Sequence, residues 1–170
     1  LDWQKIETAK HRLFYSLHKL KLPTKFNIND QPLNLRFDFL APDPNNPSAI
    51  KTGHANGLIT LNIQEANAAH REYIKEQLSE RYRTLLGHFR HEVGHFYWEV
   101  LIQPNPKKLE EFRALFGDDT QDYGAALQAH YKNGAPENWR ENYISSYATM
   151  HAWEDWAETW AHYLHLMDML

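Results

Sequence analysis

Two histidines four residues apart are the part of this sequence best suited to chemistry. They stand in the run His91-Glu92-Val93-Gly94-His95, where both imidazoles share one face of a helix and can bind a single metal ion. The carboxylate of Glu92 can reach a water on that metal and act as general base. The run therefore predicts a zinc hydrolase. The alternative is a pair of histidines that are solvated or hydrogen-bonded for structural reasons.

A long amphipathic helix is expected to carry this run. Apolar residues recur at spacings of three and four, so we predict one helix over residues 70–102 with a buried apolar stripe. His91 and His95 project to the opposite side, together with Gly87 and Gly94. A glycine inside a helix costs about 1 kcal/mol. The two glycines therefore indicate that another element closely approaches the backbone there.

A catalytic zinc needs a third protein ligand, and the C-terminal segment offers candidates. Aromatic residues repeat at three and four from residue 151 onward, which predicts a second amphipathic helix. Its other face carries Glu154 and Glu158, one helical turn apart. One carboxylate can bind metal while the other accepts the second N–H of a liganding histidine. Surface exposure is the alternative for both, and Asp155 is expected to be solvated or to cap the helix.

The residues in these two helices resemble known metallopeptidases. HEVGH followed 59 residues later by EDWAE resembles the gluzincins, in which a glutamate from a downstream helix completes the zinc site. The stretches LLGHFRHEVGHFYW, EFRALFGDDTQDYGAAL and SSYATMHAWEDWAETWAHYLH look like a bacterial family of zinc-binding metallopeptidases, whose members often follow a zinc-ribbon domain. The resemblance covers most of the chain from about Leu33 onward. It implies one zinc ion held by His91, His95 and Glu154.

The resemblance also implies the roles of the other site residues. Glu92 would be the base, and Glu158 would support a liganding histidine. Gluzincins use a tyrosine one or two turns before the third ligand to donate to the oxyanion; Tyr147 fits that place and Tyr143 is the alternative. The implied activity is hydrolysis of peptide bonds in a peptide or protein substrate through a metal-activated water. The rival functions are a zinc-stabilised scaffold or binding domain with the same ligands, and a metal-free helical interaction module.

Composition limits the other classes of function. The chain has 170 residues, 42% of them hydrophobic, and we expect one domain over residues 1–170. A net charge of −4 argues against a nucleic-acid partner, and no apolar run or signal peptide indicates a membrane. The absence of cysteine is compatible with the cytoplasm, which is the predicted location. Because the chain begins without methionine and ends within a helical pattern, we expect it to be an excised domain, with an upstream zinc ribbon in the full-length protein.

The predicted fold is α+β: a small antiparallel sheet packed on the active-site helix, followed by a mostly helical half whose last helix crosses that helix at the metal. The predicted segments are an N-terminal helix in residues 1–23, the sheet in 33–63, the active-site helix in 70–102 and the helical half in 107–170.

Within the sheet, alternating apolar residues predict a strand over Leu33 to Leu40, and Asn56-Gly57 predicts a hairpin turn. Leu58 to Asn62 is the candidate edge strand that could pair with an extended substrate, with a plain structural strand as the alternative.

The remaining histidines are expected to be structural. His54, in the hairpin turn, should be solvated, and His130 and His151 lie at predicted helix ends, where interaction with the helix dipole is the ordinary explanation. His162 and His165 are expected to be buried among the aromatic residues of the last helix. Of these two, His165 is the better functional candidate.

Overall fold

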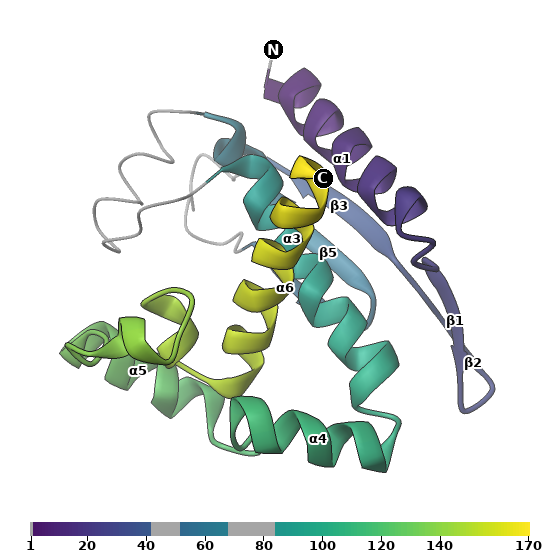
Figure 1. Ribbon diagram of the computed structural model, residues 1–170. Coiled ribbons are helices and arrows are strands. Elements are labelled where there is room, and N and C mark those ends of the chain that lie inside the picture. The colour runs from purple at the N-terminus through teal and green to yellow at the C-terminus, as the bar shows by residue number, and fades with distance from the viewer. Residues whose placement is uncertain (1, 42–51, 68–83) are drawn as a thin grey trace.

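The computed structural model describes residues 2–41, 52–67 and 84–170. It confirms the predicted α+β class (Figure 1). The helices are α1 (Asp2–Lys19), α3 (Leu85–Tyr97), α4 (Pro106–Phe116), α5 (Tyr123–Asn133) and α6 (Ala152–Met169). The strands are β1 (Lys25–Ile28), β2 (Gln31–Asn34), β3 (Arg36–Leu40), β4 (Gly53–Ala55) and β5 (Leu58–Asn62). Short helical turns are η1 (Ile63–Ala66), η2 (Trp98–Ile102), η3 (Trp139–Glu141) and η4 (Tyr147–Thr149).

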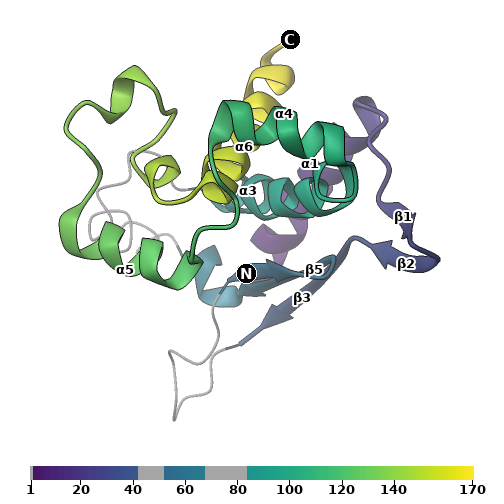
Figure 2. The ribbon, with the colours of Figure 1, turned by 90° about the horizontal axis from the view of Figure 1, so that it is seen from below.

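The strands form two small sheets. Strands β1 and β2 pair antiparallel, and the second sheet has the order β3-β5-β4. In that sheet β4 and β5 are antiparallel, as predicted for the hairpin, and Asn56 and Gly57 have φ of 48° and 73°. Strand β3 pairs with β5 in parallel, a relation that alternation alone could not indicate. The layer of β3 and β5 lies on one side of α3, and α6 crosses the other side (Figure 2).

Two predictions about these strands are wrong. The stretch Leu33 to Leu40 is not one strand, because β2 ends at Asn34 and β3 begins at Arg36 in the other sheet. Leu58 to Asn62 is not an edge, because β5 pairs with a strand on each side and buries Ile59 and Leu61 completely. Hydrophobic alternation reports that one face is buried but not how many neighbours a strand has. The edges of this sheet, within the described residues, are β3 and β4.

The N-terminal helix packs on the helix that carries the histidine pair. The apolar pattern predicted this helix from about Asp2 to Leu20 within the segment 1–23, and α1 spans Asp2–Lys19. Lys21 has a φ of 55°, which stops the helix before Pro23. Completely or almost completely buried residues of α1 and α3 form the main core: Ile6, Leu13, Leu17, Phe89, Val93 and Phe96. This contact holds one face of α3 against the interior and leaves another face for α6.

The active-site helix is shorter than the predicted 70–102. Thr84 has an extended backbone, with φ −108° and ψ 156°, and its hydroxyl accepts from the Gly87 N–H at 3.0 Å. Thr84 is therefore the N-cap of α3, and one continuous helix through this position is wrong. Residues 70–83 of the prediction lie outside the described residues. After Tyr97 the helix widens into the π-helical turn η2 and ends at Ile102.

The last helix crosses α3 closely at Gly94, as predicted for that glycine. A Cβ on Gly94 would lie 3.0 Å from Ala157 Cα and 3.2 Å from Trp160 Cβ, so a side chain there would push α6 away. Trp156 Nε1 donates to the Gly94 carbonyl at 2.8 Å across the same contact. The close approach brings the first turn of α6 beside His91 and His95. Among the described helices, none combines the length and the apolar character that a membrane crossing requires.

A buried arginine joins three helices on the far side of this crossing. Arg90 of α3 is 1% exposed, forms an ion pair with Asp168 of α6, and donates to Nδ1 of His165. Ser16 of α1 donates to Asp168 Oδ1 at 2.8 Å. Burial and the neighbouring guanidinium lower the pKa of His165. His165 is therefore a member of this cluster.

Replacing Asp168 with Asn is expected to destabilise the fold by about 2–3 kcal/mol. Loss of one partner from a buried pair costs roughly 3–5 kcal/mol, and less is expected here because the Asp168 side chain is 27% exposed. Burial raises the pKa of Asp168, but Ser16 and Arg90 outweigh it and leave the pKa below its usual value. The stabilisation should therefore be complete above the usual aspartate pKa and be lost as pH falls through the depressed one.

Urea unfolding of the metal-free protein at neutral and acid pH checks this prediction. The matched control is Asp2→Asn, which breaks the surface pair with Lys5, in which the two side chains are 50% and 54% exposed. An exposed pair contributes about 0–1 kcal/mol. Equal effects of the two substitutions, or a difference that does not shrink in acid, would contradict the role assigned to Asp168.

Candidate metal centre

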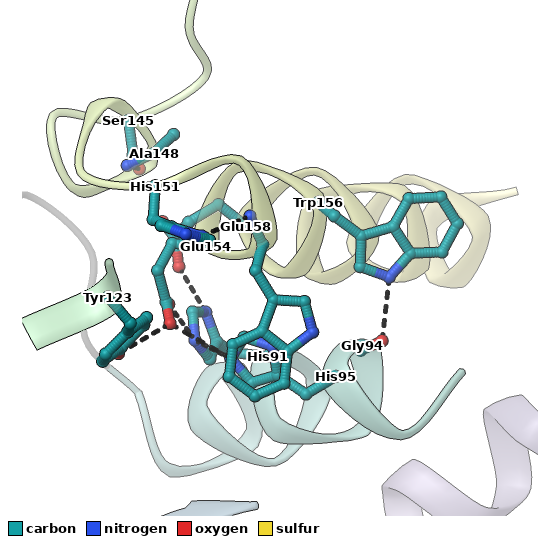
Figure 3. Close-up of polar contacts among 11 residues, drawn as sticks. His91, Gly94, His95, Tyr123, Ser145, Ala148, His151, Glu154, Trp156 and Glu158 are labelled. Atoms are coloured by element: carbon teal, nitrogen blue, oxygen red, sulfur yellow. Dashed lines mark hydrogen bonds and ion pairs between the residues drawn. The ribbon is translucent and has the colours of Figure 1, made fainter. Parts of the chain in front are cut away.

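Two histidines from α3 and one glutamate from α6 converge on a single point (Figure 3). His91 Nε2 lies 2.9 Å from Glu154 Oε2, and His95 Nε2 lies 3.5 Å from Glu154 Oε1. The two Nε2 atoms are 3.1 Å apart. One donor atom from each residue lies within 4.8 Å of the others, which is the arrangement that a shared metal ion needs. The predicted meeting of the histidine pair with Glu154 is confirmed.

Local structure at the start of α6 places Glu154 in the first helical turn. His151 is the N-cap, and its Nδ1 accepts from the Trp153 N–H at 3.1 Å. Its Nε2 donates to the Gln121 carbonyl at 3.2 Å. The predicted dipole interaction of His151 is therefore wrong, because a protonated histidine is favoured at a helix C-terminus and this one accepts at an N-terminus. His130 does lie in the last turn of its helix, α5.

The donor set fits a catalytic zinc ion. Two imidazole nitrogens and one carboxylate are a known ligand combination that leaves a fourth position open. Glu154 is 2% exposed and His95 is 3% exposed. Glu154 Oε2 faces His91 Nε2, yet it makes no well-directed hydrogen bond with any described residue. Buried polar atoms normally have a hydrogen-bond partner, so a buried carboxylate oxygen without one is consistent with a site that binds a cation.

The charges of the site also favour a cation. Burial lowers the pKa of His91, but its contacts with Glu154 and Glu158 outweigh that and raise the pKa well above its ordinary value. Burial raises the pKa of Glu154, but His95 and His91 outweigh it and hold the pKa well below its ordinary value. Both carboxylates therefore stay ionised, and in the metal-free protein a proton on His91 compensates them. A divalent ion would take over that role.

Glu158 lies where it can orient one of the histidines. Its Oε1 is 2.7 Å from His91 Nδ1, on the opposite side of the ring from Glu154. The Ser145 hydroxyl hydrogen-bonds to Glu158, and His91 together with this bond lowers the pKa of that carboxyl against the effect of burial. An ionised partner at Nδ1 keeps the proton there and directs the Nε2 lone pair toward the centre.

The other sequence candidates differ in their relation to this centre. Glu92 is 9% exposed, and Tyr147 lies with its ring 6.2 Å from the His91 ring, centroid to centroid. Tyr143 is 37% exposed and lines a pocket of about 150 Å³ beside His151. No described contact joins Tyr143 to the three metal-binding candidates.

Three residues at the centre were missed or misjudged from the sequence. Tyr123 donates to Glu154 Oε1 at 2.9 Å, and the Trp153 ring lies 3.8 Å from the His95 ring. His54 was predicted to be solvated, but its side chain is 2% exposed and its ring stacks 6.4 Å from that of His95. Burial lowers the pKa of His54 to about 4.

The predicted solvation or capping role of Asp155 is also wrong. Asp155 is 8% exposed, and burial raises its pKa to about 6, against a hydrogen bond from Thr159. A helical projection places Asp155 away from Glu154 but cannot show that neighbouring segments cover it.

Comparisons with known proteins agree with this geometry. The family described as "Putative zinc-binding metallo-peptidase" matches residues 1–170. Proteins of Mycobacterium bovis and Mycobacterium tuberculosis, each described as uncharacterized, are 48% identical over 169 residues, which is 99% of this chain and 49% of theirs. The chain thus spans about half the length of the curated relatives it matches, and no solved structure matches it. Since the family match covers every residue, the chain belongs to this family.

Proposed function

We propose that this chain is a zinc-dependent peptidase that hydrolyses peptide bonds in peptide or protein substrates. The observation that carries the proposal is the convergence of His91 Nε2, His95 Nε2 and a Glu154 oxygen within 4.8 Å, from two crossing helices. A bound zinc ion lowers the pKa of a coordinated water and polarises the scissile carbonyl. The His91 and His95 rings and Glu154 would hold that ion.

Glu92 is the proposed general base. Within the described part of the chain, neither a hydrogen bond nor an ion pair engages its carboxylate, so the oxygens are free to accept a proton. Glu92 lies on α3 between the two histidines of the candidate site. Burial, then the charge of Glu154 and last that of Glu92 raise the pKa of Tyr123, which donates to Glu154. A carboxylate in this position takes the proton of the attacking water and returns it to the leaving amine.

Tyr147 is the proposed donor to the oxyanion that forms as the carbonyl is attacked. Burial, followed by the charge of Glu154, raises the pKa of Tyr147 far above its usual value, so the phenol keeps its proton at any working pH. A protonated hydroxyl beside the ligands can donate where negative charge develops. Its ring already lies against His91, at 6.2 Å between centroids.

Zinc removal should abolish hydrolysis, and zinc alone should restore it. The protein would be incubated with a mixed peptide library, and cleavage followed by mass spectrometry before chelation, after chelation, and after addition of one equivalent of zinc. Cleavage that persists in the metal-free protein would overturn the assignment of zinc. Stoichiometric zinc without cleavage of any peptide would overturn the peptidase assignment and favour the zinc-stabilised scaffold.

A further inference from the structure

The two oxygens of Glu154 have different surroundings. Oε1 accepts the Tyr123 hydroxyl at 2.9 Å and lies 3.5 Å from His95 Nε2. Oε2 lies 2.9 Å from His91 Nε2 and has no hydrogen bond of good geometry with any described residue. A hydrogen bond from a phenol occupies one oxygen of a carboxylate and so disfavours binding of a metal ion through both oxygens. The asymmetry leaves a single oxygen free for a cation.

Tyr123 is held in a way that directs its hydroxyl. Its ring packs edge-on against His151 at 5.5 Å and against Trp153 at 6.1 Å, centroid to centroid, and both of these residues belong to the start of α6. Tyr123 itself is the first residue of α5 and follows the N-cap Asp122. The beginning of α5 is therefore fixed relative to the turn that carries Glu154 (Figure 3).

The contact is not explained by the packing of α5. Every residue of α5 is described, and none of them is fully buried. Tyr123 is 38% exposed, yet its hydroxyl reaches a carboxylate that is 2% exposed. A tyrosine that only covered apolar surface would not place its one proton on the acceptor that also faces the histidines.

From this arrangement we infer that Tyr123 is a positioning residue that keeps Glu154 a one-oxygen ligand. Its hydroxyl engages Oε1 and so presents Oε2 to the metal, which leaves a coordination position for water or for the substrate carbonyl. The inference rests on the proposed metal site. It also orders two phenols that hydrogen-bond to each other: Tyr123 gives its only proton to Glu154, so Tyr147 is the donor to Tyr123. A substrate oxyanion would take over the Tyr147 proton from the Tyr123 oxygen.

Cobalt substitution tests this inference without any peptide. In the Tyr123→Phe variant, Oε1 loses its donor and joins Oε2 on the metal, so the visible absorption of the cobalt-loaded protein should weaken as the coordination number rises. The matched control is Tyr131→Phe, which removes a hydroxyl from the same helix at a residue that is 59% exposed. The control should keep the wild-type spectrum. Melting in excess chelator reports whether either variant is less stable without metal.

Turnover provides a second measurement. Loss of an outer partner of a metal ligand reduces activity by about 10- to 100-fold, so we expect kcat of Tyr123→Phe to fall by that factor with little change in KM. A cobalt spectrum that is identical to that of Tyr131→Phe would overturn the inference, even if the chelated variant melts at a lower temperature. If wild-type protein cleaves no peptide, the proposed function fails, but the spectral comparison still decides the role of Tyr123.

Discussion

Replacing Glu92 with Gln is expected to reduce kcat by about 10²- to 10⁴-fold, the contribution typical of a positioned general base. The amide has nearly the same shape as the carboxylate but cannot accept the proton of the attacking water. Glu92 stands outside the group of residues that could hold a metal, so bound zinc should stay at one equivalent per chain. Peptide cleavage rates and zinc content, measured on the same preparation, check the two halves of this prediction.

The control for this variant is Glu110→Gln, which removes one negative charge from an exposed position of α4. It should leave kcat, KM and zinc content unchanged. Full activity of Glu92→Gln would refute its role as base, and loss of zinc together with activity would assign it to metal binding instead.

The chemistry of the site could be predicted from the sequence because it depends on helical spacing. His91 and His95 are four residues apart, and that spacing alone places two imidazoles on one face. Glu154 and Glu158 are related in the same way within their own helix. The meeting of the two helices was predicted on the resemblance and on Gly94, whose missing side chain is what allows Ala157 to approach.

The parts that could not be predicted depend on contacts between distant segments. Tyr123 is 31 residues from Glu154 in the sequence, and no spacing rule links a tyrosine at the start of one helix to a ligand on another. His54 was predicted to be solvated because it was assigned to the turn, but it lies in β4, and its ring packs against His95 and Phe96 of α3. The place of β5 in the middle of its sheet likewise depends on β3, which precedes it by about 20 residues.

The start of α3 shows a third limit. Apolar residues continue at helical spacing on both sides of Thr84, so periodicity alone predicted an uninterrupted helix. The hydroxyl of Thr84 instead accepts the Gly87 N–H, and its extended backbone starts a new helix. A threonine within a helical pattern can be an internal residue or a cap, and only the path of the chain before it decides between them.

Substitution of Glu154 is expected to weaken zinc binding more than substitution of Glu158. Glu154→Gln removes the only carboxylate among the three candidate ligands, so the dissociation constant for zinc is expected to rise by more than 100-fold. Glu158→Gln removes the acceptor 2.7 Å from His91 Nδ1, an outer partner. Loss of such a partner weakens metal binding by roughly 10- to 100-fold. Both changes keep the length of the side chain and remove one negative charge.

Because the charge lost is the same, the difference between the two variants isolates direct coordination. Competition with a zinc-binding dye at neutral pH gives both constants, with Glu110→Gln as the control for charge alone. A larger loss in Glu158→Gln than in Glu154→Gln would exchange the two assignments, which the one-turn spacing of these residues permits. Equal and small losses would show that neither carboxylate binds zinc and would remove the basis of the proposed peptidase mechanism.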